Sequence, residues 1–218
     1  MMVVKKFETV IFDWNGTLID DAWLSVKAMN RMLKKRGMDP ITVDYYTEIF
    51  EFPVINYYKT LNLDVENEWE EISKEFVDYY LEDISEIKLF EDVKIFVHYL
   101  KDNQIERGIL SAMKHEWLNG HVKKLGIDHF FSFIQGIEDH YGEGKSHLAK
   151  KIKEKLSADP HKVLFIGDTV HDLEVSQKAG FKTILVPRGH NSVKRLKKTG
   201  TTVLNSFKEI ISFIESEK

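Results

Sequence analysis

An apolar run that ends on a carboxylate and passes at once into a turn is the feature that most constrains this chain. Residues 9–12, Thr-Val-Ile-Phe, have the composition of a buried strand, and Asp13 follows them directly, ahead of Asn15 and Gly16. Strands of parallel sheets are typically apolar on both faces, and the ligands of open α/β sheets bind at the carboxyl ends of such strands. We therefore expect Asp13 to lie in a ligand site at one edge of a sheet.

Short β-rich runs recur along the chain and alternate with segments that have the pattern of helices. The runs are Thr9–Trp14, Glu106–Ser111, Lys162–Gly167 and Lys182–Val186, with a weaker one at Phe130–Ile134. The helical segments are Asp92–Asn103, Lys114–Leu125, Lys145–Leu156 and Asp172–Ala179. Gly126 and Gly180 each follow one of these segments, where a left-handed C-terminal cap is common. The alternation predicts an α/β fold with a doubly wound parallel sheet and right-handed crossovers.

Residues 20–88 break this alternation and contain no convincing buried strand. Apolar residues recur there at the spacing of one helix face, in two sets: Ala22, Val26, Met29 and Leu33, then Trp69, Ile72, Phe76 and Tyr79. We therefore predict a core domain of residues 1–19 and 89–218, and a small helical domain of residues 20–88. A fixed helical subdomain and a mobile one are both compatible with this pattern.

The composition sets limits on function. The 218 residues are 43% hydrophobic and 30% charged, which is typical of a soluble globular protein. A net charge of −4 argues against bulk nucleic-acid binding. The absence of cysteine excludes disulfides and thiolate catalysis and suits a cytoplasmic location. We expect neither a signal peptide nor a membrane span, and a monomer or a homodimer.

A pair of carboxylates follows the most apolar run, Val163–Ile166. Asp168 and Asp172 stand four residues apart across a strand-to-helix turn, so they can face one cation. Mg²⁺ prefers hard oxygen ligands of this kind and usually keeps several waters. Asp172 is also in a suitable position to cap the following helix, and the two roles are compatible.

Two further residues have the chemistry of phosphate binding. Ser111 ends a predicted strand, and its hydroxyl, together with the next backbone N–H groups, can bind a phosphate oxygen. Lys145 opens a predicted helix after Gly142-Glu143-Gly144, where its ammonium can reach a phosphoryl oxygen and compensate the charge of a nucleophilic carboxylate.

In order and spacing these motifs resemble those of the haloacid dehalogenase (HAD) superfamily, whose members are mostly Mg²⁺-dependent phosphatases, and among them the phosphoglycolate phosphatase-like proteins. The resemblance covers about residues 7–190. It implies that Asp13 is a nucleophile that forms an aspartyl-phosphate, and that residues 20–88 are a cap over the site. It implies that a small phosphorylated metabolite contacts Thr17, Ser111, Ala112 and Lys145. The implied Mg²⁺ ligands are Asp13, the backbone carbonyl of Asn15, Asp168, and Asp172 directly or through water.

Asn15 departs from the family pattern, which usually has a second Asp there as general acid/base. Asparagine keeps the backbone carbonyl but cannot transfer a proton, a contribution typically of about 10²–10⁴-fold. Three functions remain open: a phosphatase of altered efficiency, a dehalogenase-like or phosphonatase-like hydrolase, and a non-catalytic phosphate-binding or regulatory protein. The phosphonatase chemistry would require a Schiff-base lysine in the cap, where the lysines include Lys27, Lys34, Lys35 and Lys59.

Other side chains suggest weaker hypotheses. His171 is a candidate for the missing base, although most histidines in such positions are surface residues. The basic run of Arg188, His190, Lys194, Arg195, Lys197 and Lys198 favours a solvated helix face over a polyanion site. The aromatic residues Tyr45, Tyr46, Phe50, Phe52, Tyr57 and Tyr58 favour helix packing, with Phe52 and the pair Tyr57-Tyr58 as candidates for a substrate-facing loop.

Overall fold

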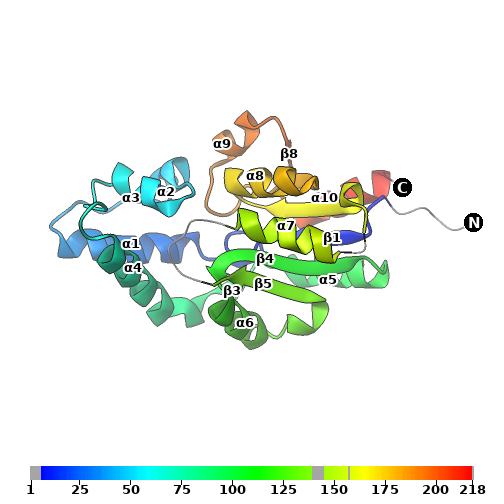
Figure 1. Cartoon of the computed structure of the whole chain (residues 1–218), viewed down its shortest axis with the longest axis horizontal. Helices are drawn as coiled ribbons and strands as arrows, with labels where there is room; N and C mark the ends of the chain where they lie inside the picture. The colour runs from blue at the N-terminus through cyan, green and yellow to red at the C-terminus, as the bar shows by residue number, and fades with distance from the viewer. Residues whose placement is uncertain (1–5, 139–144, 157, 218) are drawn as a thin grey trace, which may run out of the picture.

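The computed structural model describes residues 6–138, 145–156 and 158–217. Among these residues six strands form one parallel sheet in the order β5–β4–β1–β6–β7–β8 (Figure 1). The strands are β1 (Thr9–Phe12), β4 (Glu106–Lys114), β5 (Phe133–Ile137), β6 (Val163–Gly167), β7 (Lys182–Leu185) and β8 (Thr202–Val203). Because β1 lies between β4 and β6, Asp13 follows an interior strand.

Helices cover both faces of this sheet. On one face lie α5 (Val93–Asp102), α6 (His115–Lys124) and α10 (Phe207–Ser216), and on the other α7 (Ser146–Lys155) and α8 (Val170–Ala179), while α9 (Val193–Lys198) lies beside β8. Short 3₁₀ turns span Ile84–Glu86, Asp128–Phe130 and Pro160–Lys162. The doubly wound α/β fold predicted from the alternation is therefore confirmed. No helix in the described part of the chain is long and apolar enough to cross a membrane.

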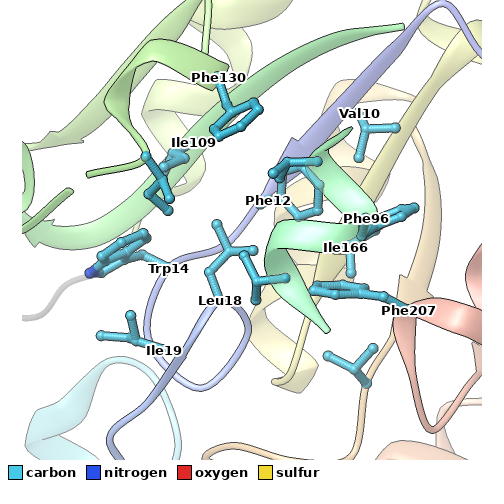
Figure 2. Packing of buried hydrophobic residues seen from close by; sticks show 14 of the residues in the cluster. Val10, Phe12, Trp14, Leu18, Ile19, Phe96, Ile109, Phe130, Ile166 and Phe207 are labelled. Atoms are coloured by element: carbon cyan, nitrogen blue, oxygen red, sulfur yellow. The ribbon is translucent and has the colours of Figure 1, made fainter. Parts of the chain in front are cut away.

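Alternation along β1 divides the core into two layers. Val10 and Phe12 belong to the hydrophobic cluster under α5 and α10, whereas Ile11 faces α7 and α8. The ring of Phe12 meets Phe96 and Phe207 edge-on, with centroids 5.7 and 6.0 Å apart (Figure 2). All four residues of β1 are fully buried, so the strand that positions Asp13 is fixed from both sides.

The weakest strand prediction is wrong in its position. Phe130–Ile134 was expected to be extended, but Phe130 ends a 3₁₀ turn and β5 starts three residues later. The carbonyl of Phe130 accepts a hydrogen bond from Nε of Arg107 at 2.7 Å, and its ring is buried in the core. The apolar character of Phe130 therefore reflects burial of a turn, which periodicity cannot distinguish from a strand.

The helix that carries Asp172 begins at Val170, two residues earlier than predicted. Thr169 is its N-cap: its side chain accepts a hydrogen bond from the N–H of Asp172, whose carboxylate in turn accepts one from the N–H of Thr169. This reciprocal capping box fixes the carboxylate of Asp172 in place. Gly180 ends the helix at φ +79°, and Gly126 follows α6 at φ +71°, so both predicted left-handed glycines are confirmed.

Residues 20–88 form a helical unit beyond the carboxyl edge of the sheet (Figure 1). Its helices are α1 (Ala22–Lys35), α2 (Val43–Ile49), α3 (Val54–Thr60) and α4 (Trp69–Asp83). The predicted faces of α1 and α4 meet in a hydrophobic cluster of their own. At the base of the unit, β2 (Ile19–Asp20) pairs antiparallel with β3 (Lys88–Leu89), which brings the two ends of the unit together.

Candidate active site

Three carboxylates meet at the carboxyl edge of the sheet. Asp13 follows β1 and Asp168 follows β6, and these strands are neighbours in parallel register. Asp172, from the first turn of α8, joins them, and each of the three residues has a carboxylate oxygen within 4.8 Å of the others. All three are buried, with exposed fractions of 7%, 0% and 1%. The structure thus brings together carboxylates that are separated by 155 residues in the sequence.

Lys145 enters this cluster from the residue before α7. Its ammonium contacts Oδ1 of Asp13, lies 2.8 Å from Oδ1 of Asp172 and donates to the carbonyl of Leu110 at 2.9 Å. Burial lowers the pKa of Lys145, but the two carboxylates outweigh this and leave the pKa above its usual value. Lys145 is therefore a fixed cation. The preceding residues 142–144 of the predicted motif lie outside the described part of the chain.

The charges of this cluster do not balance. Burial raises the pKa of Asp13 well above its usual value and that of Asp168 to about 6, and Asp172 adds to both shifts. Burial also acts on Asp172, but the contact with Lys145 holds its pKa below the usual value. When all three are ionised, Lys145 compensates one of three negative charges. The remaining two, carried by hard oxygen donors, fit a divalent cation.

Glycines allow the chain to pass close to Asp168. A Cβ atom at Gly16 would lie 2.4 Å from Oδ2 of Asp168, and one at Gly189 would lie 2.1 Å from the same oxygen. Gly16 also has φ +70°, a conformation that side chains strongly disfavour. Both positions therefore require glycine. Two further contacts fix Asp168: the hydroxyl of Thr17 donates to Oδ1 at 2.9 Å, and the N–H of His190 donates to Oδ2 at 2.6 Å.

The remaining predicted site residues lie around the same edge. Ser111 is buried in β4, and its Oγ accepts a hydrogen bond from the N–H of Met113 at 3.0 Å. Ala112 and Met113 line the same cavity as Asp13. The Oγ of Ser111 also lies 3.5 Å from Oδ1 of Asn15. Every residue that the sequence predicted for the site thus lies at this edge, although the hydroxyl of Thr17 is directed to Asp168.

Asn15 is held in a buried polar network that sequence reasoning missed. Its Nδ2 donates to Oδ2 of Asp21 at 2.8 Å and to the hydroxyl of Tyr80 at 3.0 Å. The Tyr80 hydroxyl donates to the same oxygen of Asp21 at 2.7 Å. Because Asp21 is only an acceptor, the amide must present its NH₂ group to this side. The carboxamide oxygen is consequently turned toward Ser111 and the site.

His190 completes the network from the opposite side. Burial lowers the pKa of His190, but Asp21 raises it to about 9, so the ring is protonated at neutral pH. Its Nε2 lies 3.3 Å from Oδ1 of Asp21, and its Nδ1 donates to the hydroxyl of Tyr46 at 2.8 Å. Asp21 and His190 therefore form a buried ion pair that contributes no net charge to the site.

The solvated-face interpretation of the basic run is wrong for Arg188, His190 and Arg195, the last of which is half-buried and donates to the carbonyl of Phe50. His190 is buried in the site, and Arg188 donates to Asp92 at 2.7 Å and to the carbonyl of Thr17 at 2.8 Å. Both precede α9, on which Lys194, Lys197 and Lys198 are exposed as predicted. The position of Arg188 and His190 in the sequence could have indicated this: both residues follow β7, and the carboxyl ends of parallel strands meet at one edge of the sheet.

His171 is a buried residue, so its interpretation as a surface histidine is also wrong. Its ring packs against Phe52 with centroids 4.7 Å apart, and its Nε2 accepts a hydrogen bond from the N–H of Lys145 at 3.3 Å. Burial lowers its pKa. The ring therefore contacts the backbone of Lys145 and the helical unit. It is absent from the residues that line the cavity in the described part of the chain.

A cavity of about 180 Å³ lies between the carboxylates and the helical unit. Asp13, Asn15, Lys145 and Asp172 line its base. Its upper wall includes Tyr46, Phe50, Phe52, Tyr57 and Tyr58, so most of the aromatic residues assigned to helix packing also face this space. The arrangement can hold an anionic group on the charged base and an organic group against the aromatic wall.

Sequence and structure comparisons agree with this geometry. The sequence model of the haloacid dehalogenase-like hydrolases matches residues 10–186. The chain is 29% identical to a phosphoglycolate phosphatase of Aquifex aeolicus over 185 residues, which cover 83% of this chain and 85% of the relative. It is 26% identical to the pyrophosphatase PpaX of Bacillus cereus over 184 residues, covering 83% of each protein.

Solved structures show the same fold. A haloacid dehalogenase-like hydrolase from Streptococcus pneumoniae superposes with a TM-score of 0.81, over 95% of this chain and 98% of that protein. The sequence identity is 19%, so this likeness concerns the fold alone.

Proposed function

Because the chain belongs to the haloacid dehalogenase-like hydrolase family, we propose that it hydrolyses a small phosphate monoester with Mg²⁺, through an aspartyl-phosphate on Asp13. The family and the phosphatases among its relatives place the chain among the phosphatases of this enzyme class. The observation that supports the finer proposal is the buried cluster of Asp13, Asp168 and Asp172 around Lys145.

In the proposed reaction a carboxylate oxygen of Asp13 attacks phosphorus, and the bond from phosphorus to the ester oxygen breaks. The leaving oxygen takes the electron pair and acquires its proton from water. A water molecule then hydrolyses the acyl phosphate, which releases phosphate and regenerates Asp13. Lys145 orients Asp13 through Oδ1 and compensates charge on the transferred group, and the hydroxyl of Ser111 and the N–H of Ala112 would bind its oxygens.

The metal site proposed here uses Asp13, Asp168 and the backbone carbonyl of Asn15, with Asp172 as a direct ligand or one that acts through water. The donors are all oxygen, and two of their negative charges lack a partner in the protein, which suits Mg²⁺. Bound Mg²⁺ would supply electrostatic compensation between the carboxylate nucleophile and the anionic phosphate. Thr17 and His190 hold the carboxylate of Asp168 in a fixed orientation.

Asn15 limits which leaving groups the site can use. Its Nδ2 is directed toward Asp21 and Tyr80, and an amide does not exchange a proton with the leaving oxygen at neutral pH. A positioned acid is typically worth about 10²–10⁴-fold. The reaction therefore favours leaving groups that are stable as anions, since these need the least protonation.

We propose that residues 1–19 and 89–218 are the core domain, and that residues 20–88 are a cap that closes over the cavity. The separate hydrophobic cluster of α1–α4 supports this division, as does the β2–β3 pair at the junction. Closure would exclude water from Asp13 and bring the aromatic wall onto the substrate.

The alternative chemistries receive less support. A dehalogenase does not need the carboxylates of Asp168 and Asp172, which are buried here at a cost in desolvation. A phosphonatase would need a cap lysine at the cavity. Among the described residues, 6–138, 145–156 and 158–217, no lysine of the segment 20–88 lines the cavity. The candidates Lys27, Lys34, Lys35 and Lys59 therefore all lie outside it.

Hydrolysis of p-nitrophenyl phosphate and acetyl phosphate, with Mg²⁺ and with EDTA, tests the proposed function. We expect Mg²⁺-dependent turnover that falls by about 10³-fold or more in Asp13→Ala, because the nucleophile is lost. Asp102→Asn, an exposed change at the end of α5, is the matched control and should retain full activity. Equal turnover by Asp13→Ala and the parent would refute the role of Asp13. Turnover seen only in Asn15→Asp would indicate phosphate binding without hydrolysis in the natural chain.

A further inference from the structure

The wall that the helical unit contributes to the cavity is almost free of charge. Among the described residues of 20–88 that line the cavity, Asp21 is the charged one, and it is paired with His190. The others are aromatic, aliphatic or hydroxyl-bearing: Ser25, Tyr46, Phe50, Phe52, Val54, Tyr57, Tyr58, Ser73, Phe76, Val77, Tyr80 and Leu81. The part of a substrate that extends beyond the phosphate therefore meets an apolar, largely aromatic surface.

The cations of the helical unit are placed elsewhere. Five of them pair with carboxylates of the same unit or its junction: Lys27 with Asp83, Arg31 with Glu82, Lys35 and Arg36 with Glu75, and Lys74 with Asp78. Lys34, Lys59 and Lys88 are exposed, and none of them is among the lining residues. Within the described part of the chain, this unit offers no cation to an anionic leaving group.

The cations that do line the cavity have partners. Lys145 contacts Asp13 and Asp172, and His190 pairs with Asp21. Lys114 is half-buried, with its ammonium 5.2 Å from the ring centre of Trp117 and 3.9 Å from Glu116. The contact of Lys114 with Glu116 is exposed and weak, so a second anionic group on the substrate would lack a counter-charge along the wall of residues 20–88, away from Lys114. Burying an unpaired charge in this way is strongly unfavourable.

Tyr57 contributes a buried polar group to this wall that has no partner among the described residues. Its hydroxyl is buried and makes no hydrogen bond to any described residue, while its ring packs against Tyr46 and Phe50 with centroids 5.5 Å away in both pairs. A buried hydroxyl is normally hydrogen-bonded. Tyr57 lines the cavity, and a rotation that brings its shielded hydroxyl into this space would let a neutral polar group of a ligand supply the missing bond.

Size and leaving-group chemistry narrow the substrate further. A protein cavity of roughly 150 Å³ accommodates benzene, so about 180 Å³, part of which the phosphate occupies, leaves room for no more than one ring. A phenol ionises near pH 10, whereas an alkyl alcohol is a far weaker acid, about as weak as water. Because Asn15 cannot donate a proton, a phenolate leaves more readily from this site than an alkoxide.

Resting on the proposed phosphatase function, we infer that this site selects aryl phosphates: monoesters of an uncharged, single-ring phenol that carries a neutral hydrogen-bonding group for Tyr57. It discriminates against phosphoryl compounds with a second anionic group, such as the ester 2-phosphoglycolate and the anhydride pyrophosphate, although relatives of this chain are named for them. Asp13 attacks phosphorus, the bond from phosphorus to the aryl oxygen breaks, and the phenolate departs with the electron pair.

Two esters that differ in charge alone test this inference. 4-(Carbamoylmethyl)phenyl and 4-(carboxymethyl)phenyl phosphate release phenols of similar acidity, because the methylene group insulates the ring. We expect kcat/KM at least tenfold higher for the carbamoyl ester, and phenyl phosphate to exceed 2-phosphoglycolate by a similar factor. Equal or higher kcat/KM for the carboxylate ester would overturn the inference. A preference for the carboxylate ester that is lost in Lys114→Met would also overturn the inference, because it would show that Lys114 binds the second anion.

Variants locate the selectivity on the wall. Tyr57→Phe should lower the kcat/KM ratio of the carbamoyl ester to phenyl phosphate. Val77→Lys places a cation on the cavity wall and should shift the preference at least tenfold toward the carboxylate ester. Ile95→Lys adds the same charge at a position on α5 that is 68% exposed, and should leave the preference unchanged. Equal shifts in the two lysine variants would contradict a role for the wall.

Binding of non-hydrolysable analogues separates this inference from the proposed function. Benzylphosphonate mimics phenyl phosphate, and phosphonoacetate carries a second anion in place of the ring. We expect calorimetry with Mg²⁺ to give at least tenfold tighter binding of benzylphosphonate. Tighter benzylphosphonate binding without turnover of any ester would retain the ligand class and refute the hydrolysis. Tighter phosphonoacetate binding, with Asp13-dependent turnover, would refute the aryl selectivity and retain the hydrolysis.

Discussion

The amide at position 15 and the carboxylate at position 21 act as one unit at the residue scale. Asn15 donates to Asp21, and both share the hydroxyl of Tyr80. A carboxylate is therefore present beside position 15, but the NH₂ group of Asn15 lies between it and the site. Restoring an acid at position 15 cannot be treated as an isolated change, because it would face the buried charge of Asp21.

Asn15→Asp should destabilise the protein by about 1–3 kcal/mol, since a buried donor is replaced by an acceptor next to a carboxylate. The exchanged pair, Asn15→Asp with Asp21→Asn, again offers one amide and one carboxylate, but it removes the carboxylate partner of His190 and should recover only part of this loss. Chemical denaturation of the two single variants and the double variant measures the coupling. Additive losses would show that the two side chains do not interact in solution.

The protonation of His121 is coupled to folding. It is 5% exposed, and its ring meets Trp14 edge-on at 5.6 Å. Burial lowers its pKa below the usual 6.5, so the folded state binds fewer protons than the unfolded state between the two pKa values. The resulting stability is fully present above pH 6.5 and is lost as the pH falls below it.

His121→Leu should therefore reduce the dependence of the unfolding free energy on pH below pH 6.5. Urea denaturation at a series of pH values measures this dependence. His161→Leu is the matched control, because His161 is exposed, and it should keep the pH profile of the parent. Identical profiles for His121→Leu and the parent would contradict the assignment.

At the scale of elements, the helical unit is joined to the core by hydrogen bonds from the segment that follows β7. Asn191 donates through Nδ2 to the carbonyl of Phe50 at 2.9 Å and accepts at Oδ1 from the N–H of Val170 at 3.0 Å. One buried side chain thus ties the end of α2 to the start of α8. The aromatic wall is thereby held over the carboxylates.

Asn191→Ala leaves the N–H of Val170 without its partner, while the carbonyl of Phe50 keeps its contact with Arg195. The change should cost about 1–2 kcal/mol of stability. Because Asn191 positions Phe50, we also expect a several-fold increase in KM for phenyl phosphate, with kcat changed less. Steady-state kinetics and thermal unfolding measure both effects. Asn205→Ala, at an exposed site that bonds Glu209, is the control. A pure fall in kcat would instead indicate damage to the carboxylate cluster.

For the whole molecule, the carboxylate cluster should couple metal binding to stability. A ligand that binds only the folded state at 100 times its Kd adds about 2.7 kcal/mol. For a chain of 218 residues this corresponds to a rise in Tm of about 5–10 °C. We expect this rise with saturating Mg²⁺, and its loss in Asp168→Asn. A rise of equal size in Asp168→Asn would place the bound Mg²⁺ elsewhere.

Much of the fold could be predicted because short segments of the sequence specify their own secondary structure. The runs at Thr9–Trp14 and Lys162–Gly167 are apolar enough to specify interior strands, and their ends differ from β1 and β6 by at most two residues. Asp13, Lys145, Asp168 and Asp172 were identifiable because each stands at a junction between elements. A charged side chain directly after a predicted strand, or at the start of a predicted helix, can be recognised from a few neighbouring residues.

The sequence by itself determined the α/β class, the helical unit and the residues proposed for phosphate and metal. Only the tertiary structure decided what surrounds Asn15, since Asp21, Tyr80 and His190 come from three separate parts of the chain. The same holds for the uncharged wall: its cations are present in the sequence, and only the fold turns them away from the cavity. Local patterns specify elements, whereas the pairing of charges and the lining of a cavity depend on contacts between residues far apart in the chain.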